Sequence, residues 1–273
     1  MSPYDLTTLA SLKAWLGLPA AASPSDATLS ALITAASRAI YAAVSRPGLL
    51  PQSYSETIDG ETQRIFLRHW PVLQMTSLTL SGFAIPAATP ASSSPELGYL
   101  LQPGEAAPPG RPQAIDIFGW RVCPGRQNVT VAYTAGYAVQ SESQSVPAAA
   151  PLTVSALAPY GPWATDLGVA YAATGIALTA VPAAPAKGQY SASAGGYAFN
   201  AGDAGSAILI SYGYIPQDIA QAALELAAER FRAAERIGLR SKSIGGQETI
   251  SYDVSAISAP VMALLQPYRR IAV

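Results

Sequence analysis

The sequence is poor in the residue types that build redox and metal sites. It contains one cysteine, Cys123, and one histidine, His69, among 273 residues. A single cysteine excludes an internal disulfide and any zinc site with several cysteine ligands. Cys123 is therefore interpreted as an ordinary small apolar residue, and His69 as a residue packed at a strand end beside Trp70. We expect neither a metal ion nor a cofactor.

Charge is also scarce. Charged residues make up 12% of the chain, against about 25% in an average globular protein. Two interpretations stay open: a surface largely covered by neighbouring subunits, or the composition of an alanine-rich genome. The formal net charge of −1 argues against a dedicated nucleic-acid-binding surface, which would need a surplus of lysine and arginine.

Long apolar runs are missing as well. No stretch approaches the roughly eighteen consecutive apolar residues of a membrane-spanning helix. The first residues, "MSPYDLTTLASLKAWLGL", have a polar start and lack the basic segment of a signal peptide. These features predict a soluble, cytosolic, metal-free protein with no membrane partner.

The sequence contains no recognisable catalytic motif. A phosphate-binding loop needs G-x-x-x-x-G-K-[ST] between a strand and a helix, whereas in "GLRSKSIGG" the lysine precedes the glycine pair. No G-x-S-x-G motif accompanies His69, and the carboxylates are dispersed. We expect no enzyme; a hydrolase, the rival hypothesis, would depend on His69 or on an essential carboxylate.

Helical periodicity marks both ends of the chain. A first helix is predicted near residues 9–16, with Thr7 or Thr8 as its cap, Gly17 after its end, and Leu9, Leu12, Trp15 and Leu16 on one face. A longer helix follows Ser25 and ends at "SRPGLLP". Near the C-terminus, Pro216 begins a helix of about six turns that ends at Gly238, and "APVMALLQPYRR" predicts a short one.

Between these ends the period changes to alternation. "YSETIDG" and "TQRIFLRHW" predict a hairpin around Asp59–Gly60, and "MTSLTLSG", "AIDIFGW" and "NVTVAYTAGY" predict further strands. Residues 82–112 are rich in Pro, Ala, Ser and Gly, which predicts a loop with a brief strand near Tyr99.

Residues 138–213 have a different sequence pattern: short strands are separated by turn residues at intervals typical of a small all-β module. "VTVAYTAGY" precedes this segment and "ILISYGY" ends it, two strands with the same Gly-Tyr ending. This similarity predicts an inserted domain whose two ends lie close together.

The predicted fold class is α+β: a helical core with a small antiparallel β-sheet, interrupted by an all-β, sandwich-like or barrel-like inserted domain. The predicted boundaries are residues 1–138 for the first part of the core, 139–213 for the insert, and 214–273 for the long helix, loop and C-terminal docking segment.

The order of these segments resembles that of the head–tail connector (adaptor, or head-completion) family of tailed phages. The matching segments are "LTTLASLKAWLGL", "DATLSALITAASRAIYAAVSRP", "YSETIDGETQRIFLRHWPVLQMTSLTLSG", "NVTVAYTAGY", "IPQDIAQAALELAAERFRAAERIGLRSKSIGGQETISYD" and "APVMALLQPYRR". The insert departs from the simpler members and looks like a β module of phage structural proteins.

The resemblance implies a virion structural protein without covalent chemistry, located in the neck and assembled in the bacterial cytoplasm. Such adaptors form a homo-oligomeric, dodecameric ring beneath the portal protein, hold neck or tail-completion proteins, and let double-stranded DNA pass without sequence-specific binding. The rival hypothesis is a β-module that binds glycans or the capsid surface through Tyr160, Trp163, Tyr171, Tyr190 and Tyr197.

The resemblance also implies where partners bind: in "RIGLRSKSIGGQETISYD" and at the C-terminus. Glycines there permit tight turns, and paired arginines suit carboxylates. A solvated loop and a frayed tail stay open as alternatives. The residues expected at the portal or subunit interface are Arg240, Lys242, Ser243, Gly245, Gly246, Tyr252, Pro267, Tyr268, Arg269, Arg270 and Ile271.

Overall fold

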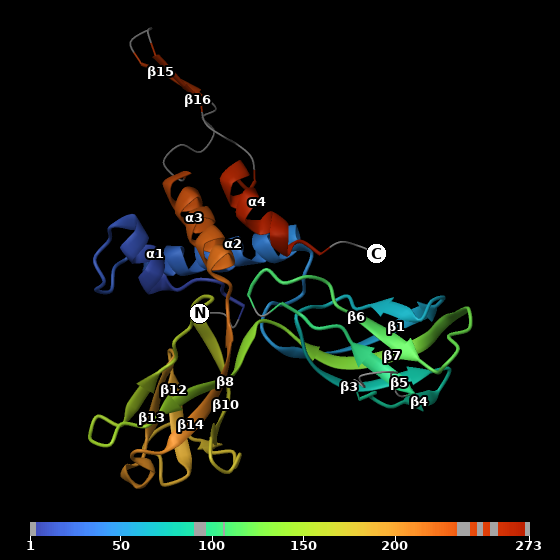
Figure 1. Ribbon diagram of the computed structural model, residues 1–273. Coiled ribbons are helices and arrows are strands. Elements are labelled where there is room, and N and C mark those ends of the chain that lie inside the picture. The colour runs from blue at the N-terminus through green and yellow to red at the C-terminus, as the bar shows by residue number, and fades with distance from the viewer. Residues whose placement is uncertain are drawn as a thin grey trace. The chain divides into compact units, whose positions relative to one another are not determined.

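The computed structural model describes residues 4–89, 97–105, 107–233, 241–244, 248–251 and 256–270. The chain divides into two compact units (Figure 1). The helical unit combines Met1–Pro47 with Pro216–Val273, and the β unit comprises Gly48–Ile215. The predicted domain boundaries at residues 139 and 213 are not the limits of these units, and they stay predictions.

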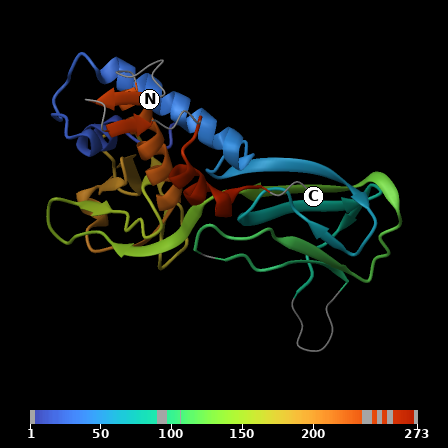
Figure 2. The ribbon, with the colours of Figure 1, turned by 90° about the horizontal axis from the view of Figure 1, so that it is seen from above.

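The helical unit is built from both ends of the chain. Its elements are α1 (Leu9–Leu16), α2 (Asp26–Val44), α3 (Gln217–Ala233), α4 (Ala259–Leu265) and the 3₁₀ turn η3 (Gln266–Tyr268). α3 crosses and contacts α2, and α1 and α4 both contact α3 (Figures 1 and 2). Leu29, Ile33 and Ile40 of α2 are fully buried and lie on one face of the helix.

The ends of α1 follow the expected local chemistry. Thr8 caps the helix through its side-chain oxygen, which accepts a hydrogen bond from the Ser11 amide at 3.0 Å. Gly17 adopts the left-handed conformation after the last turn, with φ of 70°. Trp15 was expected on one face with Leu12; Leu12 is fully buried, whereas the Trp15 side chain is 50% exposed.

A buried lysine ties the loop after α1 back to the helices. Lys13 is 3% exposed, and its Nζ lies 2.9 Å from Asp26 Oδ1 and 2.5 Å from the Ala21 carbonyl oxygen. The hydrogen bond from Lys13 is the main cause that lowers the pKa of Asp26. The Lys13 ammonium group is therefore bound inside the helical unit and adds no positive charge to its surface.

The first half of the β unit is a sandwich of two sheets. One has the strand order β1-β7-β3-β4 and the other β2-β6-β5. Leu78 and Val131 from the first sheet and Ile115 from the second belong to one buried cluster. The strands are β1 (Gln52–Gly60), β2 (Arg64–Phe66), β3 (Val72–Leu80), β4 (Phe83–Ile85), β5 (Gly98–Leu101), β6 (Ala114–Phe118) and β7 (Gly125–Ala135).

The second half of the β unit forms two more sheets, β10-β14-β8 and β11-β12-β13-β9. Ile210 of the first and Tyr197 and Phe199 of the second are buried. The elements are β8 (Ala138–Ser145), β9 (Thr153–Ser155), β10 (Trp163–Tyr171), β11 (Thr179–Ala180), β12 (Gln189–Ser193), β13 (Gly196–Phe199), the 3₁₀ turn η1 (Ala201–Asp203) and β14 (Ala207–Tyr214).

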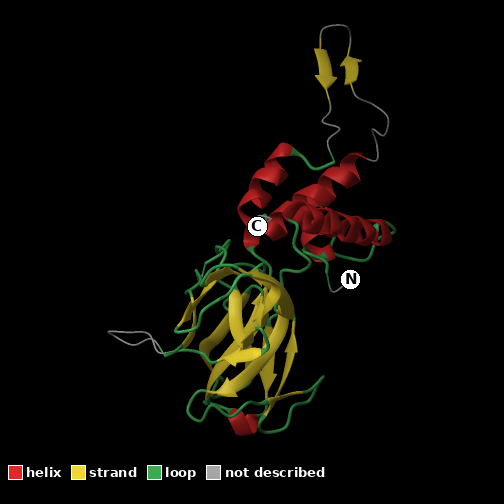
Figure 3. Cartoon of the chain, turned by 90° about the vertical axis from the view of Figure 1, so that its right-hand side faces the viewer, coloured by secondary structure: helices red, strands yellow, loops and turns green. Residues whose placement is uncertain are grey.

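The predicted fold class is wrong in its proportions. The chain is mostly β, with 36% strand and 24% helix, so it is not a helical core with a small sheet (Figure 3). Each strand before residue 138 buries few apolar side chains, and the segment expected as loop contributes β4 and β5. These strands become a large core only when distant segments pair.

The predicted hairpin around Asp59–Gly60 is also wrong. β1 pairs with β7 and β2 pairs with β6. The turn residues serve the distant β7 strand: the Asp59 carboxylate accepts from the Gln127 amide at 2.6 Å, and the Gly60 amide donates to Asn128 Oδ1 at 2.7 Å. The Asp-Gly turn motif therefore marks the end of β1, but β1 does not pair with β2, the next strand along the chain.

The two Gly-Tyr dipeptides meet, as expected from their similarity. Ala138 at the start of β8 pairs with Gly213 near the end of β14. The Tyr214 amide donates to the Tyr137 carbonyl at 3.2 Å, and the two tyrosine rings lie 5.9 Å apart. The prediction that both ends of residues 138–213 lie close together is therefore confirmed.

α2 has the length and composition of a membrane-spanning helix. Core helices of water-soluble proteins satisfy the same criterion, so this single helix is weak evidence. Part of α2 is buried, through Leu29, Ile33, Ala36, Ser37, Ile40 and Val44. The expectation that the chain has no membrane partner stays a prediction.

Candidate interaction surfaces

The predicted interface residues fall into three groups. Lys242 and Ser243 lie in β15 (Ser241–Ile244), while Pro267 and Tyr268 lie in η3, directly before Arg269 and Arg270. The remaining five lie outside the described residues: Arg240, Gly245, Gly246, Tyr252 and Ile271.

The C-terminal group is partly committed to the unit itself. Tyr268 is fully buried, and its hydroxyl donates to Asp218 Oδ2 in the first turn of α3 at 3.0 Å. The Arg270 amide donates to the Val44 carbonyl at 2.9 Å, which fastens the segment to the end of α2. Pro267 and Arg269 are exposed and are the members of this group that a partner can reach.

The segment after α3 forms an antiparallel ribbon. β15 pairs with β16 (Glu248–Ser251), from Ser241 opposite Ser251 to Ile244 opposite Glu248. The ribbon is a sheet of its own and pairs with no other strand among the described residues. The sequence predicted a loop after the long helix, so this hairpin was missed.

A shallow apolar groove runs between the end of α2 and α4. Its volume is about 260 Å³. Met262 is 38% exposed and Leu265 is buried. The groove is lined by Ala43, Ala259, Met262, Ala263, Leu265, Gln266 and Arg269.

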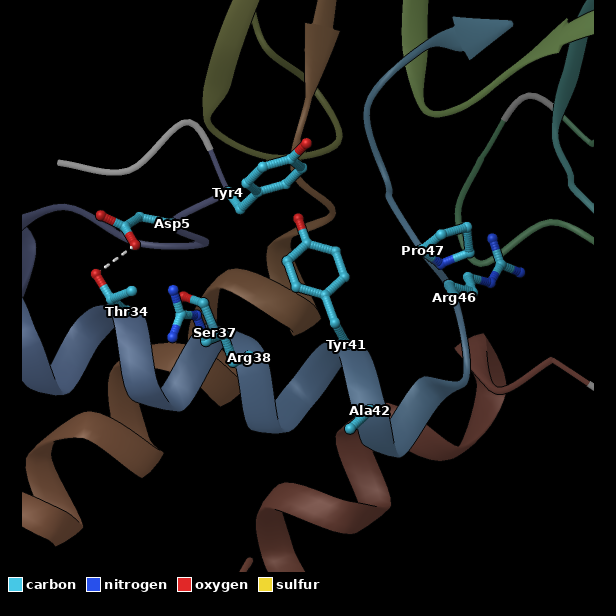
Figure 4. Close-up of a pocket in the computed structure, with 9 residues that line it drawn as sticks. All are labelled: Tyr4, Asp5, Thr34, Ser37, Arg38, Tyr41, Ala42, Arg46 and Pro47. Atoms are coloured by element: carbon cyan, nitrogen blue, oxygen red, sulfur yellow. Dashed lines mark hydrogen bonds between the residues drawn. The ribbon is translucent and has the colours of Figure 1, made fainter. Parts of the chain in front are cut away.

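A second cavity, of about 380 Å³, lies on another face of α2 (Figure 4). Tyr4 and Tyr41 meet edge to face in its wall, with ring centroids 6.4 Å apart. The Thr34 hydroxyl donates to Asp5 at 2.9 Å. In Figure 4 the side chains of Arg38 and Arg46 point in opposite directions, so the cavity does not gather its cations around one ligand position.

Buried and half-buried tyrosines in the β unit donate their hydroxyls to carboxylates. Tyr133 donates to Glu56 at 2.5 Å and Tyr212 to Glu142 at 2.6 Å. The other pairs are Tyr190 with Asp166 and Tyr171 with Asp203, each at 2.5 Å. Each bond joins segments far apart in the sequence, so the network stabilises the fold.

Three of the tyrosines proposed for glycan binding, Tyr171, Tyr190 and Tyr197, donate hydrogen bonds to these carboxylates. Tyr190 is 2% exposed and Tyr197 is fully buried, so neither ring can stack on a sugar. The Trp163 indole donates to the Tyr197 hydroxyl at 3.1 Å. Tyr160 and Tyr171 are half-buried. Tyr190 and Tyr197 therefore belong to the core, whereas Tyr160, Trp163 and Tyr171 keep part of their surface exposed.

His69 packs in a polar cluster at the edge of the first sheet. Its ring stacks on Tyr54 at 3.7 Å between centroids, and its Nε2 lies 3.5 Å from Glu56 Oε1. Its backbone amide donates to the Tyr133 hydroxyl at 3.1 Å. The contact is tertiary, so no local pattern in the sequence could reveal it. In the described part of the chain, no group of three or more His, Cys, Asp or Glu side chains could hold a metal.

Replacing Asp166 by alanine is expected to destabilise the β unit by about 3 kcal/mol. Asp166 in β10 accepts from Tyr190 of β12 and Tyr197 of β13, so it joins two sheets, and it also accepts from the Gly168 amide at 3.1 Å. The variant leaves two buried hydroxyls without their acceptor. Urea denaturation followed by tryptophan fluorescence measures the change.

A double-mutant cycle with Tyr190→Phe isolates the shared bond. Removing both partners of a buried hydrogen bond costs less than the sum of the single changes, because no polar group is left unpaired. We expect a coupling energy of at least about 1 kcal/mol. Strict additivity would show that the Tyr190–Asp166 contact contributes nothing.

No protein-family model matches the chain, and no curated protein matches it. Its function is therefore inferred from the order of its segments and from the surfaces of its two units.

Proposed function

We propose that the chain is a structural protein of a tailed-phage virion, which forms a homo-oligomeric ring between the portal vertex and the neck or tail. The order of its segments resembles that of head–tail connectors, which implies a dodecameric ring that extends the DNA channel. Its partners are further copies of itself, the portal protein and neck or tail-completion proteins. The role is mechanical and involves no covalent chemistry.

The observation that carries the proposal is the ribbon of β15 and β16. An isolated two-stranded ribbon is marginally stable in water, and no third described strand pairs with this one. A ribbon of this kind gains stability when a neighbouring chain packs against it or extends it. Such an arm suits a protein whose task is to hold subunits together.

The charge balance agrees with a DNA conduit. A ring that gripped DNA through six to ten phosphate contacts per site would hold it strongly, in a salt-dependent way. The chain has a formal net charge of −1 and only 12% charged residues. A nearly neutral chain avoids such strong holding, so DNA can slide past it during packaging and ejection.

The proposal predicts rings in negative-stain electron microscopy of the purified protein, alone or as a collar on portal particles from the same genome. Deleting residues 241–251 is expected to abolish ring formation or portal binding, because the arm is lost. Circular dichroism provides the control, since both units should keep their secondary structure. Monomers that never decorate portal particles would contradict the proposal.

A further inference from the structure

α1 and the loop that follows it carry an exposed indole and few charged residues. Trp15 is 50% exposed. Lys13 is the one charged residue between positions 9 and 25, and it is 3% exposed and paired with Asp26. We name this the Trp15 surface; its exposed residues are Ala10, Ser11, Ala14, Trp15, Pro19, Ala20, Ala21 and Ala22.

The groove between α2 and α4, here named the Met262 groove, is also poor in charge. No charged residue occurs between positions 256 and 268, and Arg269 is the one charged residue of the lining. Its volume of about 260 Å³ is below the roughly 300 Å³ at which small-molecule pockets begin. The groove therefore suits one protruding side chain better than a free ligand.

The two surfaces lie on opposite sides of the helical unit. α1 and α4 both contact α3, and they flank it on opposite sides in Figures 1 and 2. Trp15 therefore cannot fill the groove of its own chain. An exposed apolar surface on one side and a groove on the other can be joined by a second copy placed head to tail.

We propose that the Trp15 surface of one copy packs into the Met262 groove of the next copy. Aromatic residues and methionine are enriched, and charged residues depleted, in the buried centre of protein interfaces. Such a heterologous contact repeats from copy to copy and gives a ring when its rotation closes. The inference rests on the proposed ring and names the surfaces that build it.

Cysteine cross-linking tests the contact in the full chain. In a Cys123→Ser background, Ala14→Cys beside Trp15 is combined with Ala263→Cys in the groove; both positions are exposed. With a short bis-maleimide the double variant is expected to give a ladder of covalent multimers. Each single variant is expected to stay monomeric on a denaturing gel. The matched control pairs Ala14→Cys with Ser143→Cys, an exposed position of β8, and should give no ladder.

Two substitutions test the energetics from either side. Trp15→Ala is expected to raise the protein concentration needed for association by about 30-fold or more, the effect of losing an interface hot spot. Ala263→Glu should act similarly by placing a charge in the groove. Both positions are exposed, so circular dichroism should be unchanged. Leu157→Ala, at a side chain 70% exposed in the β unit, should leave association unaffected.

The outcomes separate this inference from the proposed function. Rings that form without the Ala14–Ala263 ladder, or a cross-linked dimer from Ala14→Cys alone, would overturn the head-to-tail contact and leave the connector intact. Monomers that bind portal particles would also overturn the contact alone. Monomers that bind no portal would overturn both.

Discussion

Replacing Gly136 by alanine is expected to destabilise the β unit by about 4 kcal/mol or more, a large share of the stability of an ordinary domain. Gly136 has φ of 148°, and a Cβ atom there would lie 2.4 Å from the Pro51 nitrogen and 2.6 Å from the Leu50 carbonyl oxygen. Both obstacles are backbone atoms, so no side-chain rotation can relieve the clash.

The surroundings of Gly136 make a local shift costly. Its amide donates to the Pro71 carbonyl at 2.9 Å, and the Tyr137 amide donates to the Leu49 carbonyl at 2.8 Å. Moving residues 50–51 away would therefore disturb the segment before β1 and the strands β7 and β8 together. Urea denaturation of the variant, or its loss from the soluble fraction on expression, measures the effect.

Gly82→Ala is the matched control. Gly82 also has a positive φ, 86°, and follows a strand of the same sheet, but nothing lies within 4 Å of its would-be Cβ. That variant bears only the conformational cost, about 1 kcal/mol. Equal stability of the two variants would show that the close approach of Gly136 to residues 50–51 is not tight.

Local chemistry made the helices of this chain predictable. Thr8, Gly17 and Pro216 bracket helices through interactions with residues a few positions away, and α1 and α3 begin where these signals indicate. The decisive contacts of these helix ends are near in sequence.

Strand partners were not predictable in this way. Glu56 and Tyr133 meet across 77 positions, and β1 finds β7 rather than β2. The Asp166 carboxylate accepts from two tyrosines that come from other strands, β12 and β13. The exposure of Trp15 was missed for a related reason, because periodicity only places this residue on one face with Leu12.

The β unit is expected to unfold above pH 10. Tyr133, Tyr190, Tyr197, Tyr212 and Tyr214 are each at most 2% exposed, and burial is the main cause that raises the pKa of every one of them well above 10. The unfolded chain releases these protons near pH 10, whereas the folded unit retains them. The contribution of these five tyrosines to the free energy of unfolding is therefore fully present below pH 10 and is lost as the pH rises above 10.

The expected slope is about 1.4 kcal/mol per tyrosine for each pH unit above 10, so five tyrosines remove roughly 7 kcal/mol by pH 11. This loss is comparable to the whole stability of many domains. Urea denaturation at a series of pH values measures the slope. Tyrosinate absorbance should appear together with the loss of circular dichroism, because the buried hydroxyls ionise only after the unit opens.

Tyr214→Phe isolates one titrating group. The pKa of Tyr214 is raised first by burial and then by the neighbouring Tyr137, Tyr160 and Tyr212, and phenylalanine preserves its packing. The variant should match the parent at pH 7 and recover about 1.4 kcal/mol of the loss at pH 11. An unchanged slope, or tyrosinate absorbance that precedes unfolding, would mean that these hydroxyls exchange protons with solvent in the folded state.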